Sequence, residues 1–227
     1  MKKLFLLLTI LFISFNTNAQ DWANLKHFKE ANNKLNAPAK DENRVVFMGN
    51  SITIGWSKQQ PEFFKGKSYI NRGISGQTTP QMLLRFRQDV IDLQPKVVLI
   101  LAGTNDIAGN TGPTTLKTIA NNIKSMAELA RANGIKVVIS SVVPAFDYPW
   151  KPGKNPNVKI PKLNAMLKAY AKKNKMVYLD YFTAMATPEN GLQKIHSGDG
   201  VHPNKLGYQV MAPLAEKAIA KALKRKK

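Results

Sequence analysis

The sequence contains no cysteine and only three histidines, His27, His196 and His202. Without thiols there is no disulfide bond, no thiol nucleophile and no thiolate metal site. Acidic residues are also scarce, with 14 Asp and Glu against 34 Lys and Arg. Beyond the first nineteen residues, no apolar run is long enough to cross a membrane. Any chemistry that needs an imidazole therefore has few candidates.

The formal net charge of +20 becomes +18 without Lys2 and Lys3. A charge of this size attracts polyanions over a long range and makes association sensitive to salt. The basic residues are spread over the predicted helices and no nucleic-acid-binding motif is present, so we expect no nucleic-acid partner. Anionic polysaccharide or membrane phosphate is the favoured partner class. A solvated basic surface without a dedicated partner is the alternative.

The first nineteen residues have the pattern of a secretory signal peptide. Lys2 and Lys3 form a positive n-region, residues 4–15 form an apolar h-region, and a polar stretch ends in the small residue Ala19. We therefore predict cleavage after Ala19 and export to the periplasm or the extracellular space, with no stable membrane insertion. An uncleaved anchor is the alternative interpretation.

Residues 20–227 are predicted to form a single domain, long enough for one large core and short for two. Apolar runs predict strands at 45–48, 68–71, 96–102, 136–140 and 176–180. Helical spacing predicts helices over 21–35, from Thr79 (as N-cap) to Pro95, from Thr114 or Thr115 to Gly134, over 158–173, and from Asn204 into the basic tail. Residues 144–156 are expected to be a loop of fixed shape and residues 183–203 irregular. This alternation predicts an α/β fold in which a parallel sheet lies between two helical layers.

Ser51 follows the first predicted strand in the stretch Gly49-Asn50-Ser51. In parallel α/β sheets, ligand sites lie beyond the carboxyl ends of the strands, so a turn at this point would expose the serine. A serine hydroxyl becomes a nucleophile when a base takes its proton, and the backbone N–H groups that follow can bind an anion. The alternative is an ordinary helix cap, a common role of serine after a strand.

Asp199 and His202 lie three residues apart in a loop flanked by glycine and proline. A catalytic triad needs a carboxylate on the imidazole Nδ1–H, so that Nε2 faces the serine, and one tight loop can hold both groups. The alternative is a helix N-terminus at which Asp199 or Asn204 caps and His202 packs. A zinc site with His196 as third ligand is a further option, but the spacing is a poor metal signature.

Gly73 and Asn105 are the candidates for binding an oxyanion. Acyl transfer develops negative charge on the carbonyl oxygen, and donors fixed around that oxygen lower the barrier. A glycine lets a backbone N–H approach closely, and an asparagine side chain offers a directed N–H. Taken one at a time, Gly73 is better explained as a turn glycine and Asn105 as part of an ordinary loop. Because the four polar stretches follow strand ends of one sheet, we interpret them jointly as the site of a serine hydrolase.

The chain order Gly49-Asn50-Ser51, then Gly73, then Gly103-Thr104-Asn105-Asp106, then Asp199-x-x-His202 resembles that of the SGNH hydrolases, also called GDSL-type esterases and lipases. The resemblance extends from about Val45 to Leu214, and the segments 71–79 and 95–98 are most similar to the platelet-activating-factor-acetylhydrolase-like branch. It implies a flavodoxin-like three-layer α/β/α fold with a five-stranded parallel sheet, and chemistry without a metal or an organic cofactor.

The resemblance also implies a role for each site residue: Ser51 as nucleophile, His202 as base, Asp199 as the group that orients it, and an oxyanion hole made by Ser51 N–H, Gly73 N–H and the Asn105 side chain. The sequence departs from the family pattern at Asn50, where an aspartate is usual. Asparagine has the same shape without the charge, so we expect the turn to persist without any electrostatic role of that carboxylate.

These features predict an esterase that transfers an acyl group to water through an acyl-serine intermediate. An exported, basic enzyme without an apolar lid fits short acyl groups, above all acetyl, on a small-molecule or glycan substrate, and an anionic glycan would match the charge. Asn50, Arg72 and Trp150 are candidate substrate contacts, although Arg72 could equally form a surface ion pair. Hydrolysis of lipid or lysophospholipid esters is the main alternative, because the aromatic loop 146–150 could bury an acyl chain. A non-catalytic glycan-binding domain is the third hypothesis.

Overall fold

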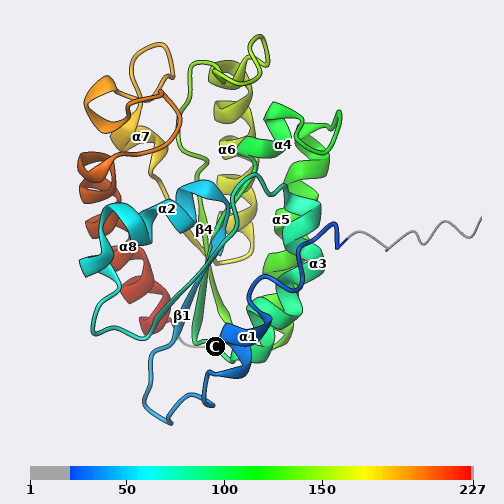
Figure 1. The fold of residues 1–227 in the computed structure, drawn as a ribbon, viewed down its shortest axis with the longest axis vertical. Coiled ribbons are helices and arrows are strands. Elements are labelled where there is room, and N and C mark those ends of the chain that lie inside the picture. Colours follow the sequence, from blue (N-terminus) through cyan, green and yellow to red (C-terminus); the bar gives the residue numbers. More distant parts are fainter. Residues whose placement is uncertain (1–20, 226–227) are drawn as a thin grey trace, which may run out of the picture.

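The computed structural model describes residues 21–225, and the predicted signal peptide, residues 1–19, lies outside the described residues. Five parallel strands form one sheet in the order β2-β1-β3-β4-β5 (Figure 1). The strands are β1 (Val45–Gly49), β2 (Tyr69–Gly73), β3 (Val97–Leu101), β4 (Lys136–Ser140) and β5 (Val177–Leu179). Their ends fall within two residues of the ranges expected from the sequence.

Helices cover both faces of the sheet (Figure 1). They are α1 (Lys29–Asn33), α2 (Ser51–Gln59), α3 (Thr79–Asp89), α4 (Thr104–Ala108), α5 (Leu116–Ala132), α6 (Pro156–Lys173), α7 (Phe182–Met185) and α8 (Lys205–Lys224), with the short 3-10 helices η1 (Pro61–Phe63), η2 (Ile91–Leu93) and η3 (Lys194–His196). Helices α3, α5 and α6 pack on one face, and α2 and α8 on the other. This confirms the predicted three-layer α/β/α fold. None of the described helices has both the length and the apolar character that a membrane span requires.

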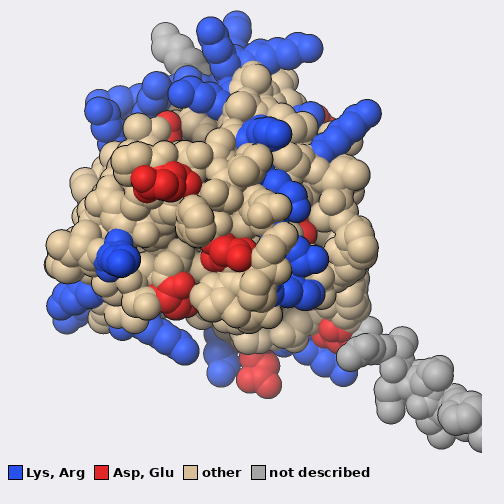
Figure 2. Space-filling view, turned by 90° about the horizontal axis from the view of Figure 1, so that it is seen from above, with Lys and Arg blue, Asp and Glu red and all other residues tan. Residues whose placement is uncertain are grey.

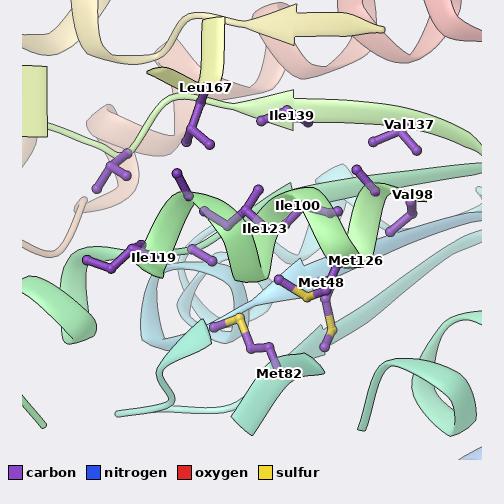
Figure 3. Close-up of a cluster of buried hydrophobic side chains, with 14 of the residues drawn as sticks. Met48, Met82, Val98, Ile100, Ile119, Ile123, Met126, Val137, Ile139 and Leu167 are labelled. Atoms are coloured by element: carbon purple, nitrogen blue, oxygen red, sulfur yellow. The ribbon is translucent and has the colours of Figure 1, made fainter. Parts of the chain in front are cut away.

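Strand β1 shows why the central strands have almost continuous apolar sequences. Its side chains alternate between two cores, Val46 and Met48 on one face and Val45 and Phe47 on the other. Both sets are buried because helices cover each face, so every position of the strand favours an apolar residue. The first core is shown in Figure 3, where helix α5 lies against β3 and β4.

The strand order places a switch point between β1 and β3. The chain leaves β1 toward β2 on one side and later returns to β3 on the other, so the connections after these two strands diverge. In open α/β sheets, the crevice outside the carboxyl ends of strands at such a point is where ligands bind. Ser51 follows β1 and Asn105 follows β3, so two of the candidate residues flank this crevice.

The predicted helix over residues 21–35 is wrong for most of its length. Only α1, residues 29–33, is helical, and the segment before it is a series of turns. The Asp21 carboxylate accepts hydrogen bonds from the backbone N–H groups of Leu25 and Lys26, and Asn24 has a left-handed φ of 56°. Asparagine tolerates this conformation better than most residues, and it interrupts the helix that the apolar spacing suggested.

Helix α2 is absent from the sequence-based prediction. It contains Thr53, Gly55 and Ser57, which have weak helix propensity. The helix forms because Ile52 and Trp56 are buried against the second core. The segment 183–203, expected to be irregular, contains the end of α7 and the whole of η3. The N-cap of α3 is residue 78, one position before the predicted one.

Candidate active site

Ser51 is the first residue of α2, directly beyond the carboxyl end of β1. The Asn50 side chain accepts a hydrogen bond from the Ile52 N–H at 3.2 Å and caps the helix. A Cβ at Gly49 would lie 2.8 Å from the Leu101 carbonyl oxygen, so only glycine fits where the chain turns from strand to helix. The turn thus presents the Ser51 hydroxyl beyond the carboxyl end of the inner strand β1, 3.0 Å from His202 Nε2.

Asp199 and His202 face each other across a single tight loop. Asp199 Oδ2 lies 2.6 Å from His202 Nδ1, and Oδ1 accepts the backbone N–H groups of Val201 at 2.9 Å and His202 at 2.7 Å. Gly200, with a φ of +77°, supplies the left-handed residue that closes the loop. Burial alone would raise the pKa of Asp199, but the backbone and side-chain hydrogen bonds from His202, together with that of Val201, outweigh it and lower the pKa to about 2.

The ionised Asp199 determines how His202 is protonated. A carboxylate only accepts hydrogen bonds, so the short contact to Nδ1 places the ring proton on that nitrogen. Nε2 is then left with its lone pair directed at the Ser51 hydroxyl. The arrangement can therefore remove a proton from Ser51 while Asp199 stabilises the imidazolium that results.

Gly73 is placed differently from the sequence-based prediction. Its N–H donates to Asn71 Oδ1 at 2.9 Å, so it is not available to a substrate oxygen. A Cβ at this position would overlap Ile54 N and lie 2.8 Å from the Asn50 carbonyl oxygen. Gly73 is thus a close-packing residue where β2 meets the start of α2, and this explains why the residue has to be glycine.

Gly76, in the turn that follows β2, offers the free N–H that was expected of Gly73. Within residues 21–225 this N–H has no hydrogen-bond acceptor. The turn is held between the two strand ends of the crevice, because the Ile74 N–H donates to the Gly49 carbonyl and Asn105 Nδ2 donates to the Gln77 carbonyl. With a φ of +76° and no described atom nearer than 4.0 Å to its would-be Cβ, Gly76 lies in an open, left-handed position. The sequence does contain a signal for this position, because Gly76 is a second glycine three residues after Gly73 in the same segment.

Asn105 is buried in the first turn of α4. One N–H of its amide donates to the Gln77 carbonyl at 2.9 Å, and the other has no described partner. The next residue, Asp106, anchors the turn through hydrogen bonds from the Thr79 N–H and hydroxyl at 3.0 and 2.5 Å. Burial raises the pKa of Asp106, and the two Thr79 donors work against that rise. Asn105 is therefore rigidly held with a spare donor.

Asn50 and Arg72, both predicted to contact substrate, are buried. Asn50 is 1% exposed and its side chain caps α2. Arg72 is 6% exposed, donates to Asn32 Oδ1 through two nitrogens, and lies 4.7 Å over the Phe28 ring. Burial lowers the pKa of Arg72 to about 10, although the nearby charge of Asp89 favours the charged form. Neither side chain is directed at a substrate, because both are used within the fold.

Trp150, the third predicted contact, is 44% exposed. Its ring stacks on the buried Tyr148 at a centroid distance of 5.3 Å and lies 5.7 Å from the His202 ring. Among the described residues no three His, Cys, Asp or Glu side chains are grouped to hold a metal ion, so the zinc alternative lacks a ligand set.

Sequence reasoning missed a buried ion pair beneath the site, Arg85 with Asp89. Both side chains are fully buried, with Arg85 Nη1 2.9 Å from Asp89 Oδ2. Arg85 Nη2 donates to the carbonyls of Gly49 at 3.1 Å and Arg72 at 2.9 Å, which are the last residue of β1 and the penultimate residue of β2. Arg85 Nε donates to Gln77 Oε1 at 2.5 Å. One guanidinium therefore ties together both strand ends and the turn that carries Gly76.

Known proteins share this fold and much of this sequence. The model of the GDSL-like lipase/acylhydrolase family matches residues 47–210. A GDSL-like lipase from Bacteroides thetaiotaomicron is 50% identical, with a TM-score of 0.86 over 88% of this chain and 99% of its own. A protein of Bacteroides fragilis assigned to the acylhydrolases is 49% identical, with a TM-score of 0.88 over 90% of this chain and 100% of its own.

An acetylxylan esterase of Xylanibacter ruminicola is 26% identical over 218 residues, which cover 81% of this chain and 44% of the esterase. The chain spans about half the length of the first curated relatives that it matches.

Proposed function

The chain belongs to the GDSL-like lipase/acylhydrolase family, and we propose that it is an exported serine esterase that removes short acyl groups, above all acetyl, from carbohydrate. Membership confirms the resemblance seen in the sequence. The catalytic part of the proposal rests on one observation, the continuous relay from Ser51 Oγ to His202 Nε2 at 3.0 Å and from His202 Nδ1 to Asp199 Oδ2 at 2.6 Å. This relay is what a serine nucleophile requires for acyl transfer.

In the proposed reaction, His202 Nε2 takes the proton of Ser51 as Oγ attacks the ester carbonyl carbon. The tetrahedral intermediate then collapses, the C–O bond to the alcohol breaks, and the Nε2 proton passes to the leaving oxygen. Water attacks the acyl-serine with His202 again as base, which releases the carboxylic acid and restores Ser51. Asp199 keeps its charge throughout and stabilises the imidazolium.

We assign the oxyanion hole to the Ser51 N–H, the Gly76 N–H and Asn105 Nδ2. The first lies at the N-terminus of the nine-residue helix α2, where backbone donors and the helix dipole favour negative charge. The other two are the free donors of the turn after β2 and of α4. Gly76 replaces Gly73 because the Gly73 N–H already donates to Asn71. The Asn105 donor is fixed before substrate arrives, so it needs no reorganisation in the transition state.

Asn105→Ala is expected to lower kcat by about 10²- to 10³-fold with a smaller change in KM, because the lost donor acts mainly on the developing oxyanion. Initial rates with p-nitrophenyl acetate measure both constants. The control Asn174→Ala removes an amide hydrogen bond of the same length, 2.9 Å to the Tyr170 carbonyl, at the C-terminal end of α6. It should leave kcat close to that of the wild type. A loss of less than tenfold in Asn105→Ala would remove Asn105 from the oxyanion hole.

A lipid acylhydrolase is the second candidate, and one feature of the structure favours it. A hollow of about 590 Å³ lies behind the catalytic loop, lined by Phe146, Leu192 and Gly198 among others. Phe146 is 59% exposed, and the lining is mostly apolar, which would suit an acyl chain.

Hydrolysis of p-nitrophenyl acetate, butyrate and octanoate, by the wild type and by Ser51→Ala, tests the proposal and separates the two candidates. We expect the highest kcat/KM on acetate, with no hydrolysis above background in Ser51→Ala. Highest activity on octanoate would favour the lipid substrate. If the wild type is no faster than Ser51→Ala on any of the three esters, the esterase proposal fails.

A further inference from the structure

We propose that a hollow beside His202 is a subsite for uncharged sugar rings of an acylated oligosaccharide, with Trp22 and Trp150 as its stacking platforms. The inference rests on the proposed esterase function and names where its glycan would bind. The hollow measures about 590 Å³, within the range of ligand pockets. Its lining includes Trp22, Asn24, Ser75, Gly76, Asn110 and Trp150. Through Gly76 and Trp150 it adjoins the proposed oxyanion hole and the catalytic histidine.

Two tryptophans on the hollow are exposed to solvent, Trp22 with 47% and Trp150 with 44% of the residue surface accessible. Trp150 has a fixed position, because it stacks on the buried Tyr148 and lies 5.7 Å from the His202 ring. A sugar ring that stacks on Trp150 would therefore lie next to the base that acts on its ester. The rigid, amphipathic indole suits this contact, since it offers an apolar face at low cost in conformational entropy.

Trp22 is also held in place, but through its backbone. Its carbonyl accepts Gln81 Nε2 at 2.7 Å, and the carbonyl of Ala23 accepts Gln77 Nε2 at 2.7 Å. The Asp21 carboxylate closes the following turn. The segment is thus anchored to α3 and to the turn that carries Gly76, while the Trp22 ring is left exposed. A ligand in the hollow would give this exposed tryptophan a partner for its apolar face.

The polar lining of the hollow indicates a hydroxylated, uncharged ligand. The Asn24 amide, the Ser75 hydroxyl and Asn110 Oδ1 have no hydrogen-bond partner within residues 21–225, so donors and acceptors are available for sugar hydroxyls. The two charged residues on the lining, Asp21 and Lys151, have opposite signs. An acyl chain would leave these polar groups unpaired, which costs binding free energy.

The charges on the surrounding face support an uncharged ligand here despite the high net charge. Figure 2 shows this end of the molecule from above: several Asp and Glu side chains lie near its middle, and Lys and Arg side chains lie around the rim and also beside these acidic ones. The hollow itself has one acidic and one basic residue on its lining, so neither sign is in excess there. The positive charge of the whole chain can attract an anionic polymer at a distance, while the sugar rings bound in the hollow carry no charge.

The test is the ratio of kcat/KM for acetylated xylo-oligosaccharides to kcat/KM for p-nitrophenyl acetate, measured separately for each variant. Trp22→Ala is expected to lower this ratio at least about tenfold, since a lost aromatic contact of this kind reaches the 1.4 kcal/mol that corresponds to a factor of ten. Trp22→Phe keeps a ring in place and should restore most of the ratio. The control Leu129→Ala removes a partly exposed apolar side chain at the end of α5 away from the crevice, and should keep the wild-type ratio.

Binding is measured independently of turnover by titrating Ser51→Ala with unacetylated xylohexaose and following tryptophan fluorescence. We expect a saturable change that weakens at least about tenfold when Trp22→Ala is added. If p-nitrophenyl acetate is hydrolysed but Trp22→Ala keeps the wild-type ratio, the subsite is refuted and the esterase stands. The subsite is also refuted, and the esterase again stands, if the wild type hydrolyses p-nitrophenyl acetate but removes no acetyl group from acetylated oligosaccharides of xylan or mannan. If no ester of any kind is hydrolysed, the esterase proposal itself has failed.

Discussion

His202→Ala is expected to lower kcat/KM for p-nitrophenyl acetate by about 10⁴-fold or more, and Ser51→Ala by a similar factor. The reason is the geometry of the relay. His202 Nε2 lies 3.0 Å from the Ser51 hydroxyl and is the base that contacts it within the described part of the chain. Without it, the attacking oxygen has to lose its proton to water, and the leaving alcohol has no positioned acid. Removing the serine abolishes the covalent route directly.

The double variant Ser51→Ala/His202→Ala makes the test more specific. Residues that act as one unit are strongly non-additive, so the double variant should be no slower than either single variant. His27→Ala is the matched control, because His27 is exposed and lies in the turns before α1. It should retain wild-type kinetics. If His202→Ala keeps more than about a hundredth of the activity, or if the two losses multiply, the two residues do not form one catalytic unit.

The strands could be predicted from the sequence because their burial leaves a strong local signal. Strand β3 is covered on both faces, and each of its five residues is apolar. The candidate catalytic loop could also be found locally, since Asp199 and His202 lie close in sequence as well as in space. The pairing of this loop with Ser51, 151 residues away, came from the resemblance and from the rule that ligands bind beyond strand ends.

The donor assignments could not be made from sequence in the same way. Gly73 is the last residue of β2 and Gly76 lies in the turn that follows, and nothing local in the sequence shows which N–H is free. That depends on the Asn71 side chain, which folds back on Gly73, and on the contact of Gly73 with the first turn of α2. Helix α2 itself was missed, because its stability comes from tertiary burial of Trp56 rather than from propensity.

The buried ion pair did leave a signal in the sequence. Met82 and Phe86 mark the apolar stripe of α3, and Arg85 and Asp89 occupy the third and seventh positions after Met82 on that same stripe. A charged pair at i and i+4 on the buried face of a helix indicates an internal salt bridge rather than a solvated surface. The many other basic residues of the chain hid this signal, because in such a sequence one more arginine on a helix is expected to lie on the surface.

Arg85→Met is therefore expected to lower the free energy of unfolding by about 3–5 kcal/mol, a large part of the stability of a single domain. The substitution leaves the Asp89 carboxylate buried, with hydrogen bonds from Asn32 and Gln88 and the charge of Arg72 nearby, but with no cation in direct contact. It also removes the donors to the carbonyls of Gly49 and Arg72. Burial lowers the pKa of Arg85, and the hydrogen bond and charge of Asp89 oppose this, so Asp89 stabilises the buried charge of Arg85.

Urea unfolding measures the change as a shift of the midpoint at constant m-value. Arg87→Met on the same helix is the matched control, because its contact with Asp92 is exposed and 4.0 Å long. An exposed pair of this kind contributes about 0–1 kcal/mol. The double variant Arg85→Met/Asp89→Leu removes the isolated charge and should recover a substantial part of the loss, which keeps the test decisive if the single variant fails to fold. A midpoint for Arg85→Met that matches Arg87→Met, or a double variant no more stable than Arg85→Met, would show that the stranded carboxylate is not what destabilises the protein.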